Sequence, residues 1–443
     1  MLTFTLQSIY LAKYGVVFPF FLAFSLVIGF WFLKVLRVRR YELAPGPFGG
    51  TASVLIPVVD EPELLFSDVL SRVQKQHSGE LLVVINGPKN SVLEQICAKY
   101  GVDFVCSEVA SKRHAIATGL KHLSGDVVVL VDSDTLWQTG MLENLLAPFS
   151  DSRVGGVTTS QRISNERDSI WTSWAAWLEV VRAEYTMPTM STFGQVGCLP
   201  GRTIAIRREI LNDSVERFLT DKFLGVHLEV SDDRSLTNYV LKAGYKTVFQ
   251  SNAFVETTAP ADLDTLFKQQ LRWARGSQYN TLRMIPWMAK HARPLLYLYL
   301  ADIVIPFLIL GGFLGWIVKF TFAIGSPNTL IEAGIEPGTM SVAEVIALAI
   351  VSSWSFLVLR FYKTLHSVRD YLLLPVYMFI NTFFLVPIRV CGFFLMAVNS
   401  AWGTRKNAFR GEKERLIAKQ TIPMFLGAVM IAGVVLLSVL EGL

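Results

Sequence analysis

The sequence predicts an α/β domain joined to an α-helical transmembrane region, and two observations lead to this fold class. Hydrophobic residues make up 52% of the 443 residues and charged residues only 17%, whereas soluble domains carry about 25% charged residues. Residues 41–293 nevertheless have ordinary soluble character, with short β-branched runs that alternate with helical segments. The apolar excess therefore lies outside this block, which excludes a disordered chain and argues against an ordinary cytosolic enzyme.

The charge and the cysteines narrow the class further. The net charge of +5 is modest, so no nucleic-acid partner is expected. Neither metal-ligand spacing nor a disulfide framework is found among the four cysteines, Cys97, Cys106, Cys198 and Cys391. We interpret them as reduced thiols in a chain whose bulk faces the cytosol.

An apolar run over residues 15–36 opens the membrane region. As a helix it is about 33 Å long, enough to cross a bilayer core of about 30 Å. Its basic residues lie at or beyond the end of the run, which is typical of a retained anchor and not of a cleaved signal peptide. The positive-inside rule places this flank in the cytosol and the N-terminus outside. The flank consists of Lys34, Arg37, Arg39 and Arg40.

Further apolar stretches lie at 295–324, 342–359, 371–398 and 422–440. The loop 325–341 carries acidic but no basic residues, as expected outside the cell. The segment 402–420 is rich in Lys and Arg, which favours the cytosol, and Pro375 and Pro387 interrupt the stretch before it. We therefore expect 371–398 to be an interfacial or re-entrant element. Four spans with both termini outside result, and five spans with an inverted end are the alternative.

Within the soluble block, residues 53–59, 81–85 and 127–131 read as buried parallel strands. Ligands of such sheets bind at the carboxyl ends of the strands. Each predicted strand is followed there by polar residues, namely Asp60 and Glu61, then Asn86, then Asp132 and Asp134. Two carboxylates one residue apart suit a hard cation such as Mg²⁺ or Mn²⁺ that also meets phosphates. Alone, an Asp-x-Asp is more often a solvated turn, but its place after an apolar strand favours a site.

Three further groups carry chemistry. Lys112 and Arg113 precede a helix predicted over 114–123, where they suit a pyrophosphate or form a solvated basic pair. Asp232 and Asp233 begin another helix, where an acid pair is either a cap or holds a general base. The last group is Gln269, Arg272 and Trp273, whose spacings of three and four residues place them on one helix face. For the Trp273 indole, packing in the core is the alternative.

Together these motifs resemble the processive family-two glycosyltransferases, which include cellulose, chitin and hyaluronan synthases. The resemblance covers nearly the whole chain and implies a GT-A-like cytosolic glycosyltransferase domain. The strings at 56–62, 83–90, 196–205, 230–238 and 269–280 are similar to those of the pneumococcal type 3 capsular polysaccharide synthases. A loop motif of hyaluronan synthases is similar to Trp402-Gly403-Thr404-Arg405.

The resemblance implies a role for each matching residue. Asp233 would be the catalytic base, with Arg234 positioning the acidic motif, and Asp134 would hold Mg²⁺ or Mn²⁺. Nucleotide-sugar binding would fall to Asp60, Glu61, Asn86, Lys112, Asp132, Gln269, Arg272 and Arg405. Acceptor binding would fall to Trp273, Cys198, Gly201, Arg202 and Asp232, and gating to Trp402, Gly403, Thr404 and Arg405. Asn86 stands where many relatives have aspartate, and Asp60 where they often have asparagine.

The implied activity is processive, inverting transfer from UDP-glucose and UDP-glucuronic acid, which makes a β-linked capsular polysaccharide and secretes it across a bacterial plasma membrane. The expected partners are UDP-sugars, the growing polysaccharide, a lipid-linked primer and membrane lipids. A hyaluronan synthase, a non-processive lipid glycosyltransferase, and a transporter with a nucleotide domain are the alternatives. The predicted parts are an anchor (1–40), the catalytic domain (41–283), an interfacial helix (284–294), two spans (295–362), the interfacial element with the gating loop (363–421) and a last span (422–443).

Overall fold

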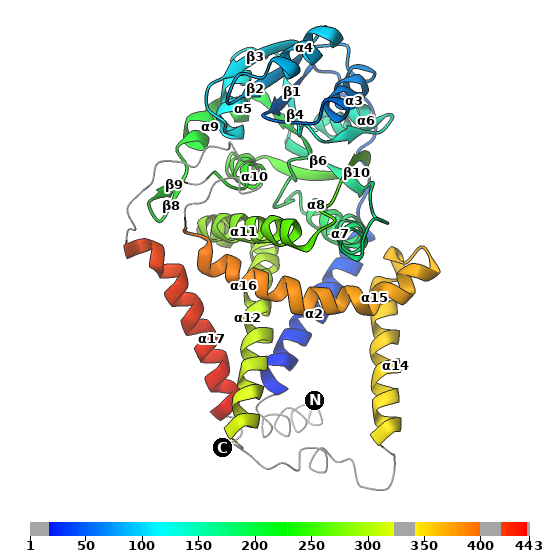
Figure 1. The fold of residues 1–443 in the computed structure, drawn as a ribbon, viewed down its shortest axis with the longest axis vertical. Helices are drawn as coiled ribbons and strands as arrows, with labels where there is room; N and C mark the ends of the chain where they lie inside the picture. Colours follow the sequence, from blue (N-terminus) through cyan, green and yellow to red (C-terminus); the bar gives the residue numbers. More distant parts are fainter. Residues whose placement is uncertain (1–16, 228, 323–341, 399–417, 441–443) are drawn as a thin grey trace. The chain divides into compact units, whose positions relative to one another are not determined.

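The computed structural model describes residues 17–227, 229–322, 342–398 and 418–440, and the chain forms two compact units (Figure 1). The first unit comprises residues 34–297 and 395–421 and contains the α/β sheet. The second comprises residues 1–33, 298–394 and 422–443 and is helical in its described parts. The gating motif predicted at residues 402–405 lies outside the described residues.

An eight-stranded mixed sheet forms the centre of the first unit, in the order β3-β2-β1-β4-β7-β6-β10-β5. Strands β1 to β4 run parallel, as predicted for the three apolar runs, while β7 is antiparallel to both β4 and β6. β10 pairs parallel with β6 and antiparallel with β5. The strands are β1 (Ala52–Val58), β2 (Leu81–Asn86), β3 (Asp103–Ser107), β4 (Val127–Val131), β5 (Leu136–Trp137), β6 (Val154–Ile163), β7 (Thr203–Arg207) and β10 (Lys246–Thr257), with a separate hairpin of β8 (Lys222–Phe223) and β9 (Val226–His227).

Helices cover both faces of this sheet. Its apolar strand residues alternate between the faces, so Val54 packs with α3 while Leu55 meets α5, where a Cβ on Gly119 would collide with the Leu55 side chain. The helices are α3 (Glu63–Gln74), α4 (Ser91–Tyr100), α5 (Lys112–Leu120), α6 (Met141–Leu146), η1 (Ala147–Ser150), α7 (Ile170–Val181), the π-helical η2 (Arg182–Thr186), α8 (Met187–Ser191), α9 (Arg208–Leu219), α10 (Asp232–Lys242) and α11 (Leu263–His291).

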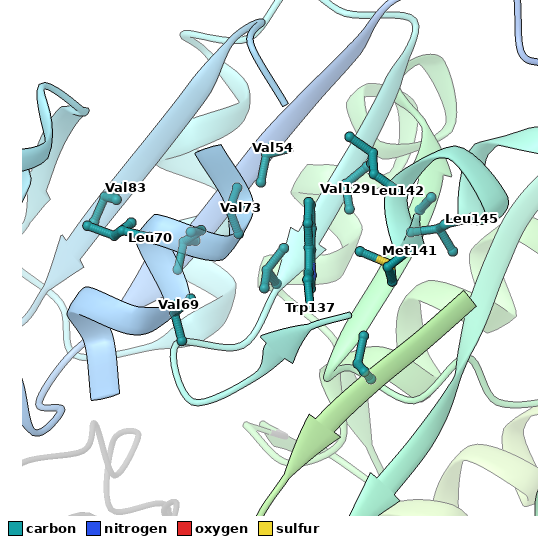
Figure 2. Close-up of a cluster of buried hydrophobic side chains, with 14 of the residues drawn as sticks. Val54, Val69, Leu70, Val73, Val83, Val129, Trp137, Met141, Leu142 and Leu145 are labelled. Atoms are coloured by element: carbon teal, nitrogen blue, oxygen red, sulfur yellow. The ribbon is translucent and has the colours of Figure 1, made fainter. Parts of the chain in front are cut away.

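The hydrophobic core on one face is centred on Trp137, which follows the end of β4 (Figure 2). Its indole lies between Val69 and Val73 of α3 on one side and Met141 of α6 on the other. The indole Nε1 donates a hydrogen bond of 3.1 Å to Thr203 Oγ1, so its one polar atom is satisfied. This anchor fixes the turn between β4 and β5, which carries the predicted carboxylates.

The second unit is a set of helices packed through small and aromatic residues. Gly311 and Gly315 of α12 lie against Val434 and Ser438 of α17, a small-xxx-small spacing that lets two helices approach closely. Figure 1 shows α15, η4 and α16 running across the direction of α12, α14 and α17. The helices that lie wholly or partly in this unit are α2 (Val17–Val38), α12 (Arg293–Phe322), α14 (Val342–Phe361), η3 (Tyr362–Thr364), α15 (Val368–Ile380), the π-helical η4 (Asn381–Leu385), α16 (Val386–Leu395) and α17 (Ile422–Leu440), and η5 (Ala418–Thr421) precedes the last of them.

Four helical stretches of the described chain are long and apolar enough to cross a membrane: Pro19–Val38, Arg293–Val318, Val368–Leu395 and Lys419–Val439. Three of them coincide with predicted spans. The fourth, Val368–Leu395, coincides with the predicted interfacial element, so its length and composition alone also suit a span. The remaining predicted span, 342–359, falls on α14, whose side chains are described only from residue 350 onward. α11 continues without a break across residue 283, where we expected the catalytic domain to end.

Candidate active site

The carboxyl ends of β1 and β4 bring the first group of predicted residues together. The two strands are parallel neighbours, so the residues that follow them share one edge of the sheet. Ser133 donates a hydrogen bond of 2.9 Å from its Oγ to Glu61 Oε1, which ties the turn after β4 to the loop after β1. Asp60 is exposed, and Asp132 and Asp134 are partly exposed on either side of buried Ser133. The structure therefore places these residues at one edge, with carboxylates open to a ligand.

Lys112 connects helix α5 to the edge of the sheet at the carboxyl ends of β1 and β4. It is the first residue of α5, and its Nζ forms a short ion pair with Asp132 Oδ1. Burial opposes a charged amine here, but Asp132, Asp232 and Asp233 together outweigh it and raise the pKa of Lys112. The three carboxylates therefore keep this ammonium in its charged form, as a phosphate-binding cation would be.

Asn86, at the carboxyl end of β2, is 1% exposed, and its Oδ1 has no hydrogen-bond partner in the described structure. A buried amide oxygen without a partner costs free energy, so such a group commonly awaits a donor from a ligand. The following Gly87 has φ +104°, a conformation that favours glycine, and it turns the chain away from the strand. Asn86 thus presents a buried acceptor atom without a partner at the carboxyl end of β2, where we expected a nucleotide-binding residue.

The carboxylates at this edge fit a divalent cation that is shared with a diphosphate. The described residues contain no group of three or more His, Cys, Asp or Glu side chains that would enclose a metal on their own. Mg²⁺ and Mn²⁺ are commonly held by one or two carboxylates, with substrate phosphates and water completing the shell. Asp134, with Asp132 beside it, supplies that kind of donor set.

Asp233, the predicted base, is half-buried on the first turn of α10. Its Oδ2 accepts a hydrogen bond of 3.2 Å from the Gly201 backbone N–H, and its Oδ1 accepts one of 2.7 Å from the backbone N–H of Arg234. A Cβ built on Gly201 would lie 3.3 Å from Asp233 Cβ and 3.4 Å from Lys112 Nζ. Only a glycine-sized residue fits without displacing a neighbour, and Asp233 and Lys112 both lie close to the Gly201 backbone.

Asp232 does not lie where we expected it. Predicted among the acceptor-binding residues, it is 6% exposed and accepts a hydrogen bond of 2.7 Å from Arg113 Nε. Burial raises the pKa of Asp232 to about 6 against the opposing effect of Arg113 and Lys112, so the carboxylate is still ionised at pH 7. Arg113, which we paired with Lys112 as a pyrophosphate ligand, lies inside α5 and is fully buried. Adjacent helical residues point in different directions, and here that separates the two cations.

The other predicted acceptor residues lie in the non-strand segment that leads to β7. The Cys198 thiol lies 3.9 Å from Asp233 Oδ2, and burial together with that carboxylate raises the pKa of Cys198 to about 12. Arg202 donates from Nη1 to Gln161 Oε1 at 2.5 Å and to Glu179 Oε1 at 3.3 Å. Its carbonyl also accepts the Asp132 backbone N–H at 2.9 Å. This segment therefore contacts both the base and the residues after β4.

Helix α11 carries the last predicted group. Trp273 is 39% exposed, while Gln269 and Arg272 are half-buried on the same helix. Gly276, one turn further on, lies so close to the loop before α10 that a Cβ there would be 2.5 Å from Ser231 Cβ. Ser231 itself has φ +66°, an unusual conformation for a residue with a side chain. The exposed indole is free to stack on a sugar, and the helix is docked tightly against the acidic motif.

Several polar residues of this region were missed by sequence reasoning. The clearest are Glu229, which accepts a hydrogen bond of 2.8 Å from Ser111 Oγ, and Asp221, which accepts one from Tyr239 at 2.8 Å and one from Arg283 at 2.5 Å. They lie in short segments without periodicity, so only the proximity of Glu229 to the Ser-Asp-Asp-Arg motif signalled a role.

Comparisons with known proteins agree with this geometry. Residues 50–276, just over half of the chain, match the family described as glycosyltransferase like family 2. Hyaluronan synthase of Streptococcus pyogenes is 27% identical over 414 residues, which cover 89% of this chain and 90% of that protein. N-acetylglucosaminyltransferase of Rhizobium meliloti (strain 1021) is 30% identical over 249 residues, 53% of this chain and 57% of that protein.

One solved structure is similar over most of the chain. It is the mannosyltransferase PcManGT from Pyrobaculum calidifontis in complex with GDP-Man and Mn²⁺, and it matches 84% of this chain and 98% of its own with a TM-score of 0.52. At 16% identity this likeness shows the fold alone, and it confirms the GT-A-like class. Together with the family match and the similarity to hyaluronan synthases, it leads to one conclusion: the chain belongs to glycosyltransferase like family 2.

Proposed function

We propose that this chain is a processive, inverting synthase that polymerises UDP-glucose and UDP-glucuronic acid into a β-linked capsular polysaccharide and secretes it across the plasma membrane. The observation that carries the proposal is the position of Asp233. Two backbone N–H groups orient its carboxylate, and it lies beside the Lys112 cation that pairs with Asp132. A base and a diphosphate-binding group that both lie close to one backbone segment suit transfer from a nucleotide sugar.

These contacts support the following reaction. An acceptor hydroxyl gives its proton to Asp233 while its oxygen attacks the anomeric carbon of the donor sugar. The bond from that carbon to the diphosphate oxygen breaks on the opposite face, so an α-linked donor yields a β-linkage and free UDP. Lys112 and Arg272 would counter the negative charge that grows on the leaving diphosphate. A divalent ion held by Asp134, with Asp132 beside it, would add Lewis-acid stabilisation of the same charge.

The nucleotide and the acceptor would bind on different sides of the donor's anomeric carbon. Asn86, with its unpartnered Oδ1, would bind the base, and Asp60, Glu61 and Gln269 would complete the donor site. Trp273 would stack on the terminal sugar of the polymer, and Cys198, Gly201 and Arg202 would line its path. The predicted gating motif, including Arg405, would close over the bound nucleotide.

The membrane part of the proposal is a plan of four spans with the catalytic domain in the cytosol and both termini outside. The element at 371–398 would lie at the cytosolic interface, which keeps the basic segment 402–420 inside. Its helices crossing the direction of α12, α14 and α17 support this placement. A polymer made in the cytosol would leave through a polar path between helices, since a polar chain does not cross lipid unaided.

A second sugar pair has a specific observation in its favour. Hyaluronan synthase is similar over 89% of this chain, and its product would require UDP-N-acetylglucosamine with UDP-glucuronic acid. The strings that are similar to those of the capsular polysaccharide synthases, such as 230–238 and 269–280, favour glucose with glucuronic acid instead. A non-processive transfer of one sugar to a lipid shares the Gln-x-x-Arg-Trp motif and differs only in product length.

Membranes that contain the full-length chain test these alternatives directly. They would be incubated with labelled UDP-glucuronic acid and either UDP-glucose or UDP-N-acetylglucosamine, and the product would be sized on a gel and digested with specific hydrolases. We expect high-mass polymer that requires both UDP-glucose and UDP-glucuronic acid. Polymer that forms only with UDP-N-acetylglucosamine would favour hyaluronan, and a short, lipid-extractable product would contradict processive synthesis. Membranes carrying Asp233→Asn serve as the matched control.

A further inference from the structure

A fully buried arginine joins the nucleotide side of the site to the base, and the mechanism above does not use it. Arg113 follows Lys112 directly on α5 but is 0% exposed. A cation placed there meets no phosphate and no solvent. Burying a guanidinium costs several kcal/mol before its contacts offset the loss, so each of those contacts is informative.

The hydrogen bonds and ion pairs of Arg113 are with two segments, namely the end of α9 with the residues after it and the first turn of α10. Its Nη1 donates to Phe218 O at 2.5 Å, in the last turn of α9, and lies 3.5 Å from Asp221 Oδ2, just beyond the end of that helix. Its guanidinium is 4.5 Å from the centre of the Phe218 ring. Its Nε donates to Asp232 Oδ1 at 2.7 Å and its Nη2 to Ser235 Oγ at 3.2 Å, both on the first turn of α10. The planar guanidinium thereby fixes both the distance and the orientation of that turn.

The sequence neighbours of these partners are the residues that do the chemistry. Lys112 pairs with Asp132 on the nucleotide side, and Arg113, one residue later, pairs with Asp232. Asp232 in turn precedes Asp233, the proposed base. The first turn of α5 therefore contacts the nucleotide edge with one residue and the base-bearing turn with the next.

Stability alone explains this arrangement poorly. A buried ion pair is often no more stabilising than apolar side chains of the same volume. Asp221 already has two other partners, Arg283 at 2.5 Å and Tyr239 at 2.8 Å, so it does not need Arg113 for neutralisation. What Arg113 alone supplies, among the described side chains, is the direct hydrogen bond to Asp232.

We propose that Arg113 is a positioning residue for the transfer reaction: it holds the Asp232 turn so that Asp233 faces the anomeric carbon of a donor whose diphosphate is bound beside Lys112. The inference rests on the function proposed above. It assigns no chemistry to Arg113 itself, which touches neither substrate nor reacting atoms.

The test compares two arginines of the same buried network. Arg113→Met removes the contact to Asp232, whereas Arg283→Met removes a contact to Asp221 and leaves Asp232 untouched. We expect Arg113→Met to lower kcat about a hundredfold with the KM for the sugar nucleotide within threefold, since misplacement by about 1 Å costs about this much. Arg283→Met should keep kcat within threefold. Equal kcat losses in the two variants would overturn the proposal.

A double variant separates positioning from folding. Arg113→Met leaves the Asp232 carboxylate buried without a partner, which lowers stability, whereas Arg113→Met with Asp232→Asn removes both charges. We expect the double variant to recover the thermal stability of the wild type but to keep the low kcat. Recovery of kcat along with stability would show a purely structural role and overturn the proposal.

A parallel assay of Asp233→Asn keeps the two claims distinct. If that variant loses transfer while Arg113→Met retains wild-type kcat, the positioning role fails and the proposed function stands. If Asp233→Asn itself retains transfer, the base assignment fails, and the positioning role fails with it.

Discussion

Two acidic motifs of this enzyme have similar sequences but opposite surroundings. Asp132 and Asp134, after β4, are both partly exposed, and Asp132 forms an ion pair with Lys112. Asp232 and Asp233, at the start of α10, are divided: one is buried against Arg113, and backbone N–H groups orient the other. The first motif is open and able to exchange its lysine for a charged ligand, while the second is fixed before any ligand binds. Binding and proton transfer need these two different kinds of carboxylate.

The largest expected effect falls on the open motif. Asp134→Asn should remove a metal-binding carboxylate and lower transfer by a thousandfold or more, roughly the several kcal/mol that a bound ion supplies to a leaving diphosphate. Calorimetry of UDP binding with and without Mn²⁺ should show that the variant has lost the metal-dependent part of the affinity. If Asp134→Asn kept its metal-dependent affinity for UDP, the motif after β4 would not be the metal-binding one, and the contrast drawn between the two motifs would be wrong.

A core substitution tests whether the open motif depends on the packing beneath it. Trp137→Ala should lower the free energy of unfolding by about 3–5 kcal/mol, because it removes a buried indole on which both α3 and α6 pack. Denaturation of the solubilised protein measures this change. Leu64→Ala, on the 87% exposed position of α3, is the control and should change stability little.

A methyl group added at Gly201 tests the close approach of the two motifs, because this glycine lies next to both Asp233 and Lys112. Gly201→Ala would place a Cβ 3.3 Å from Asp233 Cβ and 3.4 Å from Lys112 Nζ. We expect roughly a tenfold loss of kcat from a shift of a few tenths of an ångström, with little change in stability. Steady-state kinetics with both nucleotide sugars measure it, and a wild-type kcat would mean that the close approach of base and cation is unimportant.

A labelling experiment, which does not measure catalysis, reports on solvation near the fixed motif. Burial and Asp233 raise the pKa of Cys198 to about 12, so little thiolate is present at pH 8. Alkylation there should be on the order of a thousandfold slower than for an ordinary exposed thiol, of which Cys106 is the internal example. Peptide mass spectrometry after timed labelling distinguishes the two, and equal rates would show that the base lies in an open, hydrated pocket.

The open motif could be predicted from sequence, and the fixed one only in part. Asp132 and Asp134 follow a five-residue apolar strand, and an apolar run has one carboxyl end at which ligands gather. The split between Asp232 and Asp233 depends on Arg113 and the segment after α9, which are far away in sequence. Lys112 and Arg113 were expected either to suit a pyrophosphate or to form a solvated basic pair. Buried Arg113 fits neither alternative, because neighbouring residues on a helix point about 100° apart.

The same contrast holds for the strands. The parallel strands β1, β2 and β4 were predicted because both faces of each are buried, which leaves a continuous apolar run. β6 contains Gly155, Gly156 and Thr158 within its buried stretch, so its sequence resembles a loop. It is buried by tertiary neighbours such as Tyr245 and Leu199, whose contacts no local pattern reveals.

The role of Asp233 as the base decides between transfer chemistry and simple nucleotide binding. Membranes with Asp233→Asn would be assayed for polymer from both UDP-sugars and, in parallel, for UDP binding. If Asp233 is the base, the variant loses transfer by about a hundred- to ten-thousandfold, while its nucleotide affinity equals that of the wild type. Strong residual polymerisation by Asp233→Asn, with UDP bound normally, would contradict it.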